Sequence, residues 1–421
     1  MLVSVGAGNA INLTTGGAAT VLNNDTATVT ITGTQADINT TLASLKYTSQ
    51  VGITSDTLTV LSTDGTTLTD SDPLTITINN PPVNILPGPQ TVNEATQTAI
   101  NGLSVGDANT NLTSVQVSVG TGSAINLIAA GGATLSGNNT DSITISGTQA
   151  DINATLASLK YTSQAGITTD TLTVLSTDGT TLTDSDPLTI NINNPPVNTL
   201  PGTQTVDEAT QTAISGVSVA DVNTDLSTVQ VSVGAGSAIN LTASGTATVN
   251  NNDTATVTVI GNQTDINATL TTLKYTSQAG ITTDTLTVLS TDGAALTDND
   301  PLTININNPP INTLPGTQTV TEATQTAING VSVADANTDL TSVQVSVGAG
   351  TINLTADGGA TLAGNDSASV TINGTQTEIN NTLATLKYTS QAGITTDTLT
   401  VLSTDGTTLT DTDPLTITIN N

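Results

Sequence analysis

The sequence predicts an all-β fold, built as a tandem series of β-sandwiches with one short helix in each. One observation is a segment of the form LKYTSQ(A/V)GIT(T/S)DTLTVLSTDG, which occurs four times in 421 residues, with its aspartates before the final glycine 114, 114 and 113 residues apart. Solenoid units are about 20–50 residues long, so this period indicates whole domains. The other is the alternation of threonine with apolar residues, which is typical of half-buried strands. The segments start at Leu45, Leu159, Leu273 and Leu386 and carry these aspartates at Asp64, Asp178, Asp292 and Asp405.

The strands of one unit are predicted where valine, isoleucine or leucine occupies every second position. Branched side chains at that spacing form one apolar face of a pleated strand. Short strands of this kind, separated by Gly, Asn and Asp turns, favour a β-sandwich. In the third unit the predicted strands cover 229–233, 254–259, 285–290 and 302–306.

One segment of each unit has helical spacing instead. In the second unit, Ile152, Leu156 and Leu159 follow Asp151 at intervals of one helical turn, and an acidic residue at the start suits the helix dipole. We expect a short helix that crosses between the two sheets. Tyr161, the only aromatic residue of its unit, is expected to fill the core beside that helix.

The period divides the chain into one partial unit and three full ones. The partial unit, Met1–Asn80, lacks the counterpart of Pro195–Thr228, which we interpret as a cut through a longer protein. Each boundary reads Asn-Asn-Pro-Pro, and paired prolines fix the backbone and remove donors, so a stiff linker and an extended rod are expected. The full units are Pro81–Asn194, Pro195–Asn308 and Pro309–Asn421.

The composition excludes several classes of function. With 34 acidic and 4 basic residues the formal net charge is −30, which argues against nucleic acid and against an anionic membrane surface as partners. The chain has no Cys and no His, so the usual general bases, thiol nucleophiles and disulfides are missing, and we expect no enzyme. No apolar run approaches the roughly 20 residues of a membrane span.

The order of motifs resembles a known group of repeats. The stretch NNPPVNTLPGTQTVDEATQTAISGVSVADVNTDLSTVQVSV is similar to the opening of the cadherin-like repeats of giant secreted bacterial adhesins. The stretch GTQADINATLASLKYTS, followed by DTLTVLSTDG, also resembles chondroitin sulfate proteoglycan repeats. The resemblance implies Greek-key, cadherin-like (immunoglobulin-like) sandwiches of seven strands, with structural Ca²⁺ held between consecutive domains.

The resemblance also implies which residues would bind the metal. They match a glutamate after the first strand, the linker, a D-x-D loop and an A-x-D-x-G loop. Asn replaces Asp at several of these positions, which lowers the charge available to Ca²⁺, so we expect at least one ion rather than a full set of three. An alternative is that Asp221 and Asn223 simply form an Asx turn. The implied ligands are Glu94, Asn193, Asn194, Asp221, Asn223 and Asp292 at the second junction, and Glu208, Asn307, Asn308, Asp335, Asn337 and Asp405 at the third.

Identical tandem domains favour a structural role. The leading interpretation is a non-enzymatic extender, or stalk, of a large extracellular adhesin or surface protein, secreted or held at the cell surface. Its partners would be the neighbouring repeats of the same protein, with other copies or a cell-surface target beyond them. The alternative is a self-assembling extracellular fibre, in which a strand from another chain completes the partial first unit.

Overall fold

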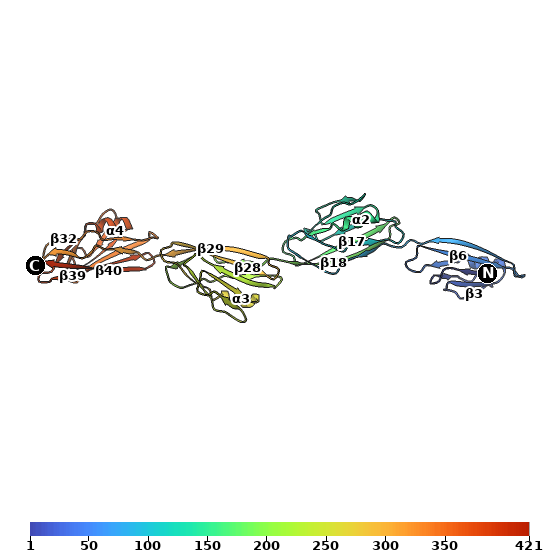
Figure 1. Cartoon of the computed structure of the whole chain (residues 1–421), viewed down its shortest axis with the longest axis horizontal. Helices are drawn as coiled ribbons and strands as arrows, with labels where there is room; N and C mark the ends of the chain where they lie inside the picture. Colours follow the sequence, from blue (N-terminus) through green and yellow to red (C-terminus); the bar gives the residue numbers. More distant parts are fainter. Residues whose placement is uncertain (421) are drawn as a thin grey trace. The chain divides into compact units, whose positions relative to one another are not determined.

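The computed structural model describes residues 1–420 and divides them into two compact units, Met1–Asn194 and Pro195 onward. Each unit contains two of the sequence repeats, here called repeat 1 (1–80), repeat 2 (81–194), repeat 3 (195–308) and repeat 4 (309–421). Every repeat has its own hydrophobic core, and no core cluster of the described chain combines residues from two repeats. The fold is all-β, with one short helix in each repeat, as predicted (Figure 1).

Within the unit Met1–Asn194, repeat 2 is the one that contains the full set of strands. Its strands are β8 Val83–Ile85, β9 Gln90–Asn93, β10 Thr98–Ala99, β11 Ser104–Gly106, β12 Leu112–Ser118, β13 Ala124–Asn126, β14 Thr134–Ser136, β15 Ser142–Ser146, β16 Lys160–Thr162, β17 Thr169–Asp178 and β18 Thr183–Asn193. Six strands form one sheet in the order β14-β15-β12-β17-β18-β9, in which β9 runs parallel to β18. Strands β10-β16-β13 form a second sheet, and β8 pairs with β11. The resemblance implied seven strands; the additional ones are short edge strands.

Repeat 1 contains β1 Leu2–Ser4, β2 Ala10–Asn12, β3 Thr20–Leu22, β4 Thr28–Thr32, β5 Lys46–Thr48, β6 Ser55–Thr63 and β7 Thr69–Thr77. Its main sheet has the order β3-β4-β1-β6-β7, and β2 pairs with β5. Counterparts of β8 to β11 do not occur in it, so β7 has β6 as its single sheet neighbour among the described residues.

Repeat 3 contains β19 Val197–Thr199, β20 Gln204–Asp207, β21 Thr212–Ala213, β22 Ser218–Ala220, β23 Leu226–Ser232, β24 Ala238–Asn240, β25 Thr248–Asn250, β26 Thr256–Ile260, β27 Lys274–Thr276, β28 Thr283–Asp292 and β29 Thr297–Asn307. Repeat 4 contains β30 Ile311–Thr313, β31 Gln318–Thr321, β32 Thr326–Ala327, β33 Ser332–Ala334, β34 Leu340–Val347, β35 Gly350–Asn353, β36 Thr361–Ala363, β37 Ser369–Asn373, β38 Lys387–Ser390, β39 Thr396–Asp405 and β40 Thr410–Asn420. Both repeats pair their strands as repeat 2 does. The strands predicted in repeat 3 are confirmed, although β26 begins at Thr256 rather than Thr254.

The predicted helix is present in every repeat and starts slightly earlier than expected. In repeat 2 the side chain of Thr148 accepts a hydrogen bond from the backbone nitrogen of Asp151 at 3.3 Å, so Thr148 is the N-cap and the helix precedes Asp151 by two residues. Ile152 and Leu156 pack into the core, and Leu159 is buried just beyond the helix. The helices are α1 Gln35–Leu42, α2 Gln149–Leu156, α3 Gln263–Leu270 and α4 Gln376–Leu383.

The tyrosine of each full repeat fills the core, as predicted. Tyr161 is fully buried, and its hydroxyl donates to Asp170 Oδ2 at 2.8 Å and lies 3.2 Å from the Ser123 hydroxyl. Burial raises the pKa of Tyr161. Burial would also raise the pKa of Asp170, but hydrogen bonds, including those from Tyr161 and the Gly120 backbone, hold it below its ordinary value. A buried hydroxyl with a charged acceptor fixes the ring in one position.

The STDG ending of the repeated segment makes the β17–β18 turn. Asp178 Oδ1 accepts from the backbone nitrogens of Thr180 and Leu182, both at 2.8 Å. Thr181 has a φ of 68°, which is uncommon for a β-branched residue, and the carboxylate bridge holds it there. The same aspartate in repeats 3 and 4 belongs to the candidate site described next.

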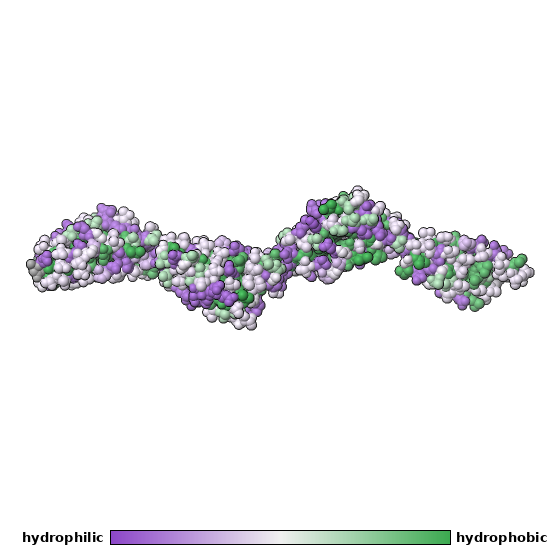
Figure 2. Space-filling view, viewed as in Figure 1, coloured by the Kyte–Doolittle hydropathy of each residue, from purple (hydrophilic) through white to green (hydrophobic). Residues whose placement is uncertain are grey.

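The exposed faces mix residue types. On the face in view, hydrophilic and hydrophobic residues are interspersed (Figure 2). No helix among residues 1–420 is long and apolar enough to span a membrane.

Candidate metal centre

Two clusters of three carboxylates lie at equivalent positions of repeats 3 and 4. In repeat 4 the cluster consists of Asp335, Asp339 and Asp405, whose oxygens lie within 4.8 Å of one another. Asp335 and Asp339 come from the loop between β33 and β34, and Asp405 ends β39. The cluster of repeat 3 is Asp221, Asp225 and Asp292.

The loop that carries Asp335 is an Asx turn. Asp335 Oδ1 accepts from the backbone nitrogens of Asn337 at 2.8 Å and Thr338 at 3.1 Å, while the Asp335 nitrogen donates to Gln376 of α4 at 2.9 Å. Thr338 has a φ of 61°. In repeat 3 the Asn223 nitrogen donates to Asp221 Oδ1 at 2.8 Å. The Asx turn considered as an alternative is therefore present, and it uses only one oxygen of each first aspartate.

The remaining oxygens give the cluster its ligand capacity. Asp335 Oδ2 and Asp339 Oδ1 are buried and have no hydrogen-bond partner, and the same holds for Asp221 Oδ2 and Asp225 Oδ1. Asp335 is 5 % exposed and Asp405 2 %. An unpaired buried carboxylate oxygen is costly, so the arrangement needs a positive charge or protons.

The cluster shifts the acidity of its own members. Burial raises the pKa of Asp339, and the charges of Asp335 and Asp405 raise it further. Burial likewise raises the pKa of Asp221, with contributions from Asp225 and Asp292. Like charges close together oppose ionisation, and a divalent cation would remove that opposition.

The last strand of repeat 3 reaches this cluster. Asn307 Nδ2 donates to Asp405 Oδ2 at 2.8 Å. The Asn308 nitrogen donates to Asn337 Oδ1 at 2.7 Å, and Asn337 Nδ2 donates to the Ile306 carbonyl at 2.8 Å. The amide of Asn337 thus clamps the two repeats together through backbone groups.

Two further predicted ligands line the same junction. Asn308 Oδ1 is buried and has no hydrogen-bond partner. Glu208, Asn308 and Asp335 all line a cavity of about 210 Å³. The Glu208 nitrogen donates to the Asn307 carbonyl at 2.7 Å, and its carboxylate accepts from the backbone of Gly280. The structure thus brings every residue predicted for the third junction to one place, although the Glu208 carboxylate is not part of the cluster.

The residues predicted for the second junction fall in different compact units. In the first unit, the Glu94 nitrogen donates to the Asn193 carbonyl at 2.7 Å, the Glu94 carboxylate accepts from Gly166, and Asn194 is buried. In the other unit lie the predicted Asp221, Asn223 and Asp292.

The junction between repeats 1 and 2 has the same loops with a different side chain. Asn79 Nδ2 donates to Asp178 Oδ2 at 2.5 Å, and the Asn80 nitrogen donates to Asn109 Oδ1 at 2.8 Å. The position of Asp339 is taken by Asn111, so this site has two carboxylates instead of three.

Sequence reasoning missed Asp225 and Asp339. The signal was present, because the loops read DANTN in repeat 2 but DVNTD and DANTD in repeats 3 and 4. The resemblance covers the first and third residues of this loop and does not extend to the fifth.

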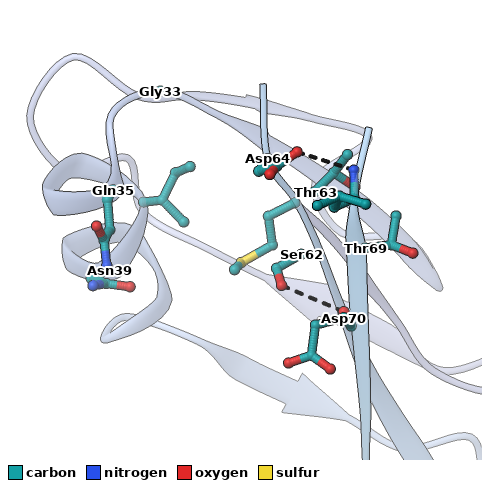
Figure 3. Close-up of a pocket in the computed structure, with 11 residues that line it drawn as sticks. Gly33, Gln35, Asn39, Ser62, Thr63, Asp64, Thr69 and Asp70 are labelled. Carbon is teal, nitrogen blue, oxygen red and sulfur yellow. Dashed lines mark hydrogen bonds between the residues drawn. The ribbon is translucent and has the colours of Figure 1, made fainter. Parts of the chain in front are cut away.

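A larger pocket in repeat 1 has a structural origin. It measures about 540 Å³ and separates α1 from the β6–β7 hairpin, with Gln35 and Asn39 on one side and Asp64 and Asp70 on the other (Figure 3). In repeat 2 the counterparts of Gln35, Asn39 and Asp70 bind the opening strands. Gln149 accepts from the Asp107 nitrogen, Asn153 bonds both backbone groups of Val105, and Asp184 accepts from the Asn84 nitrogen. The pocket is therefore the place that β8 and β11 fill in a complete repeat.

No family model matches the chain, and no curated protein matches it. Among solved structures, it is similar to an I-band fragment of titin, with 9 % identity over 81 % of this chain and 99 % of that one and a TM-score of 0.35. It is also similar to protocadherin gamma B2 extracellular cadherin domains 1–5, with 13 % identity over 100 % of this chain and 73 % of the other (TM-score 0.27). For Drosophila N-cadherin the identity is 14 %, over 98 % and 92 % of the two chains (TM-score 0.24). On its own strand topology, the chain is an all-β tandem array, in which each repeat combines one larger sheet with smaller ones and one short helix.

Proposed function

We propose that this chain is a non-enzymatic extender segment of a large extracellular adhesin or surface protein of bacterial type, and that Ca²⁺ stiffens its junctions. The observation that carries the proposal is the position of the carboxylate cluster. The loop and turn that hold Asp335 and Asp405 also bind the last strand of the preceding repeat, through Asn308 and Asn307. An ion at the cluster would therefore order the junction as well as the loop.

The donor set suits calcium. Asp335, Asp339 and Asp405 offer carboxylate oxygens and Asn308 a carbonyl oxygen, and Ca²⁺ accepts six to eight oxygen ligands. Bound there, the ion would neutralise charge that otherwise destabilises the buried loop. Asn307 and Asn337 would hold the loops from outside, since their amides are engaged in hydrogen bonds.

An enzymatic role has less support. The carboxylates recur in near-identical repeats, and the chain has no His or Cys to act with them. The largest cavity described above corresponds to the opening strands of a complete repeat, so it does not indicate a substrate site.

The fibre remains a second candidate because of the same cavity and the free edge of β7. Another chain would have to donate a segment like 81–111 to fill it. In repeats 2, 3 and 4, however, that segment is already paired within its own repeat. Strand exchange would have to open a complete repeat first, which favours the extender. Sedimentation velocity separates the two, since the extender predicts monomers and the fibre predicts polymers that grow with concentration.

The calcium part is tested by small-angle scattering and calorimetry on the same chain, in Ca²⁺ and in EDTA at matched ionic strength. We expect a larger maximum dimension and a higher unfolding temperature in Ca²⁺. An ion at one hundred times its dissociation constant adds about 2.7 kcal/mol. At about 4–8 °C per kcal/mol for a domain of this size, the unfolding temperature should rise by roughly 10–20 °C. Matched NaCl controls for screening of the −30 charge. Identical scattering and melting curves in the two buffers would contradict the calcium part.

A further inference from the structure

We propose that the junctions of this chain are unequal: the one between repeats 3 and 4 depends on a divalent cation, whereas the one between repeats 1 and 2 is held by an amide in the cation's place. The inference rests on the proposed role of calcium and adds which junctions depend on the ion. It comes from comparing the two junctions that each lie within one compact unit.

The two junctions share their framework. In both, an asparagine side chain at the end of the preceding repeat donates to the aspartate of the STDG turn, at 2.5 Å in the first junction and 2.8 Å in the third. The next asparagine donates its backbone N–H to a loop asparagine, at 2.8 and 2.7 Å. That loop asparagine donates back to a backbone carbonyl of the preceding repeat, Ile78 at 2.7 Å or Ile306 at 2.8 Å. The matched pairs are Asn79 and Asn307, Asn80 and Asn308, Asn109 and Asn337, and Asp178 and Asp405.

The cluster itself differs at one position, where repeat 2 has Asn111 and repeat 4 has Asp339. The Asn111 amide nitrogen donates to Asn79 Oδ1 at 2.8 Å. Turned by half a rotation, it would donate instead to the Asp107 carboxylate, whose oxygens lie at 3.0 and 3.2 Å. In either orientation an N–H group of this protein meets an oxygen of the site. An ionised Asp339 cannot donate at all.

The consequence is visible in the unpaired oxygens. At the third junction Asp335 Oδ2, Asp339 Oδ1 and Asn308 Oδ1 are buried without a partner. Among the described residues, no counterpart at the first junction has a side-chain oxygen that is buried without a partner. These counterparts are Asp107, Asn111 and Asn80. Asp335 is 95 % buried and belongs to the cluster, so the third junction contains a buried polar group that a bound cation would satisfy.

Charge reinforces this difference. The cluster at the junction of repeats 1 and 2 has two carboxylates, and the cluster at the junction of repeats 3 and 4 has three. The number of charged ligands tunes calcium affinity over orders of magnitude. The first junction would bind calcium more weakly and would need it less, because its framework is closed without an ion. The cluster of repeat 3 has the three-carboxylate form, with two buried unpaired oxygens of its own, so we assign it to the cation-dependent type.

One other difference must be separated from this one. Glu208 lines the cavity at the third junction, and repeat 1 carries no counterpart of it. The test therefore exchanges the single loop residue in each direction and includes Glu208→Gln as a matched control.

The experiment is hydrogen exchange with mass spectrometry on the full chain, in Ca²⁺ and in EDTA at matched ionic strength. The peptides INNPPVNIL (78–86) and INNPPINTL (306–314) differ in sequence and report the Asn80 and Asn308 amides separately. In EDTA we expect exchange at Asn308 to rise by about tenfold or more, which corresponds to about 1.4 kcal/mol of lost protection, and exchange at Asn80 to change by less than about twofold.

The variants reverse the pattern. Asp339→Asn should make the Asn308 amide insensitive to EDTA, Asn111→Asp should make the Asn80 amide sensitive, and Glu208→Gln should leave the contrast in place. Equal responses at the two junctions would overturn the inference and leave the calcium role standing. Loss of the contrast in Glu208→Gln alone would also overturn it, since it would assign the effect to Glu208. No response at either junction would overturn both the inference and the calcium role.

Discussion

Repeat 1 and repeat 2 carry nearly the same hairpin, but its burial differs sharply between them. Leu188 on β18 is 3 % exposed, whereas its counterpart Leu74 on β7 is 60 % exposed. Tyr161 is fully buried, whereas Tyr47 is only partly so. The difference shows that the hairpin alone does not determine its environment; the opening strands of a complete repeat do.

The opening strands act in three places. Strand β9 adds to β18 in parallel register, with Ile190 opposite Gln90. Strand β10 pairs with β16 beside Tyr161. Strand β11 is held by Asn153, which donates to the Val105 carbonyl at 2.9 Å and accepts from its nitrogen at 2.8 Å. In repeat 1 the Asn39 side chain lines the pocket instead. One segment of about thirty residues thus completes both sheets.

The largest effect should come from supplying that segment to repeat 1. A chain with residues 195–228 placed before Met1 should gain protection in the β6–β7 hairpin equal to that of β17–β18. Burying one leucine such as Leu74 contributes about 1.5–3 kcal/mol, so we expect a total gain of more than about 3 kcal/mol. Segment-resolved hydrogen exchange measures it. A scrambled segment of equal composition is the control, and equal gains from both would show that the pocket does not select these strands.

A smaller effect should separate the two hairpins in the chain as it is. Leu188→Ala removes a buried side chain and should cost about 2–5 kcal/mol in repeat 2. Leu74→Ala, at the matched position, should cost less than about 1 kcal/mol because that side chain already faces solvent. Chemical denaturation followed by exchange of the two hairpins distinguishes them. Equal costs would contradict the exposure of Leu74. They would mean that another part of the chain covers the β6–β7 hairpin in solution.

The parts of this architecture that local pattern decides could be predicted from the sequence. Alternation located β28 and β29, helical spacing located α2, and the scarcity of aromatics placed Tyr161 in the core. The predicted start of α2 was less accurate, because the N-cap is Thr148 and the helix begins two residues before Asp151. The strands β8 and β11 have only three residues each, which is too short for a period to be seen.

The candidate site was predicted only as far as the resemblance extended. It supplied Asp335 and Asp405, which are distant in sequence and meet through β33, β34 and β39. It did not supply Asp339, because the contribution of that residue depends on facing the other two carboxylates. The role of Asn337 also required the structure, since its amide could have bound an ion or, as observed, the backbone of Ile306.

The smallest effect concerns the tyrosine hydroxyl and its dependence on pH. Tyr161→Phe removes a buried hydrogen bond to Asp170 and should cost repeat 2 about 1 kcal/mol at pH 7. Because hydrogen bonds hold the pKa of Asp170 below its ordinary value in the folded state, they stabilise the repeat above the unfolded pKa of about 4. That stability is lost as pH falls through the folded pKa, so the cost of Tyr161→Phe should shrink in acid.

Tyr47→Phe sharpens the comparison. The Tyr47 hydroxyl donates to Asp56 at 3.0 Å, and burial with the Asp56 contact raises its pKa to about 12. A raised tyrosine pKa stabilises the folded state below about pH 10, and this contribution disappears as pH rises through about 12. Since Tyr47 is partly exposed, water replaces the lost contact, and its substitution should cost less than that of Tyr161 at every pH. Equal costs in the two repeats, measured by exchange of β5 and β16 between pH 3 and pH 7, would show that the hydroxyl contributes independently of the strand β10 that covers it.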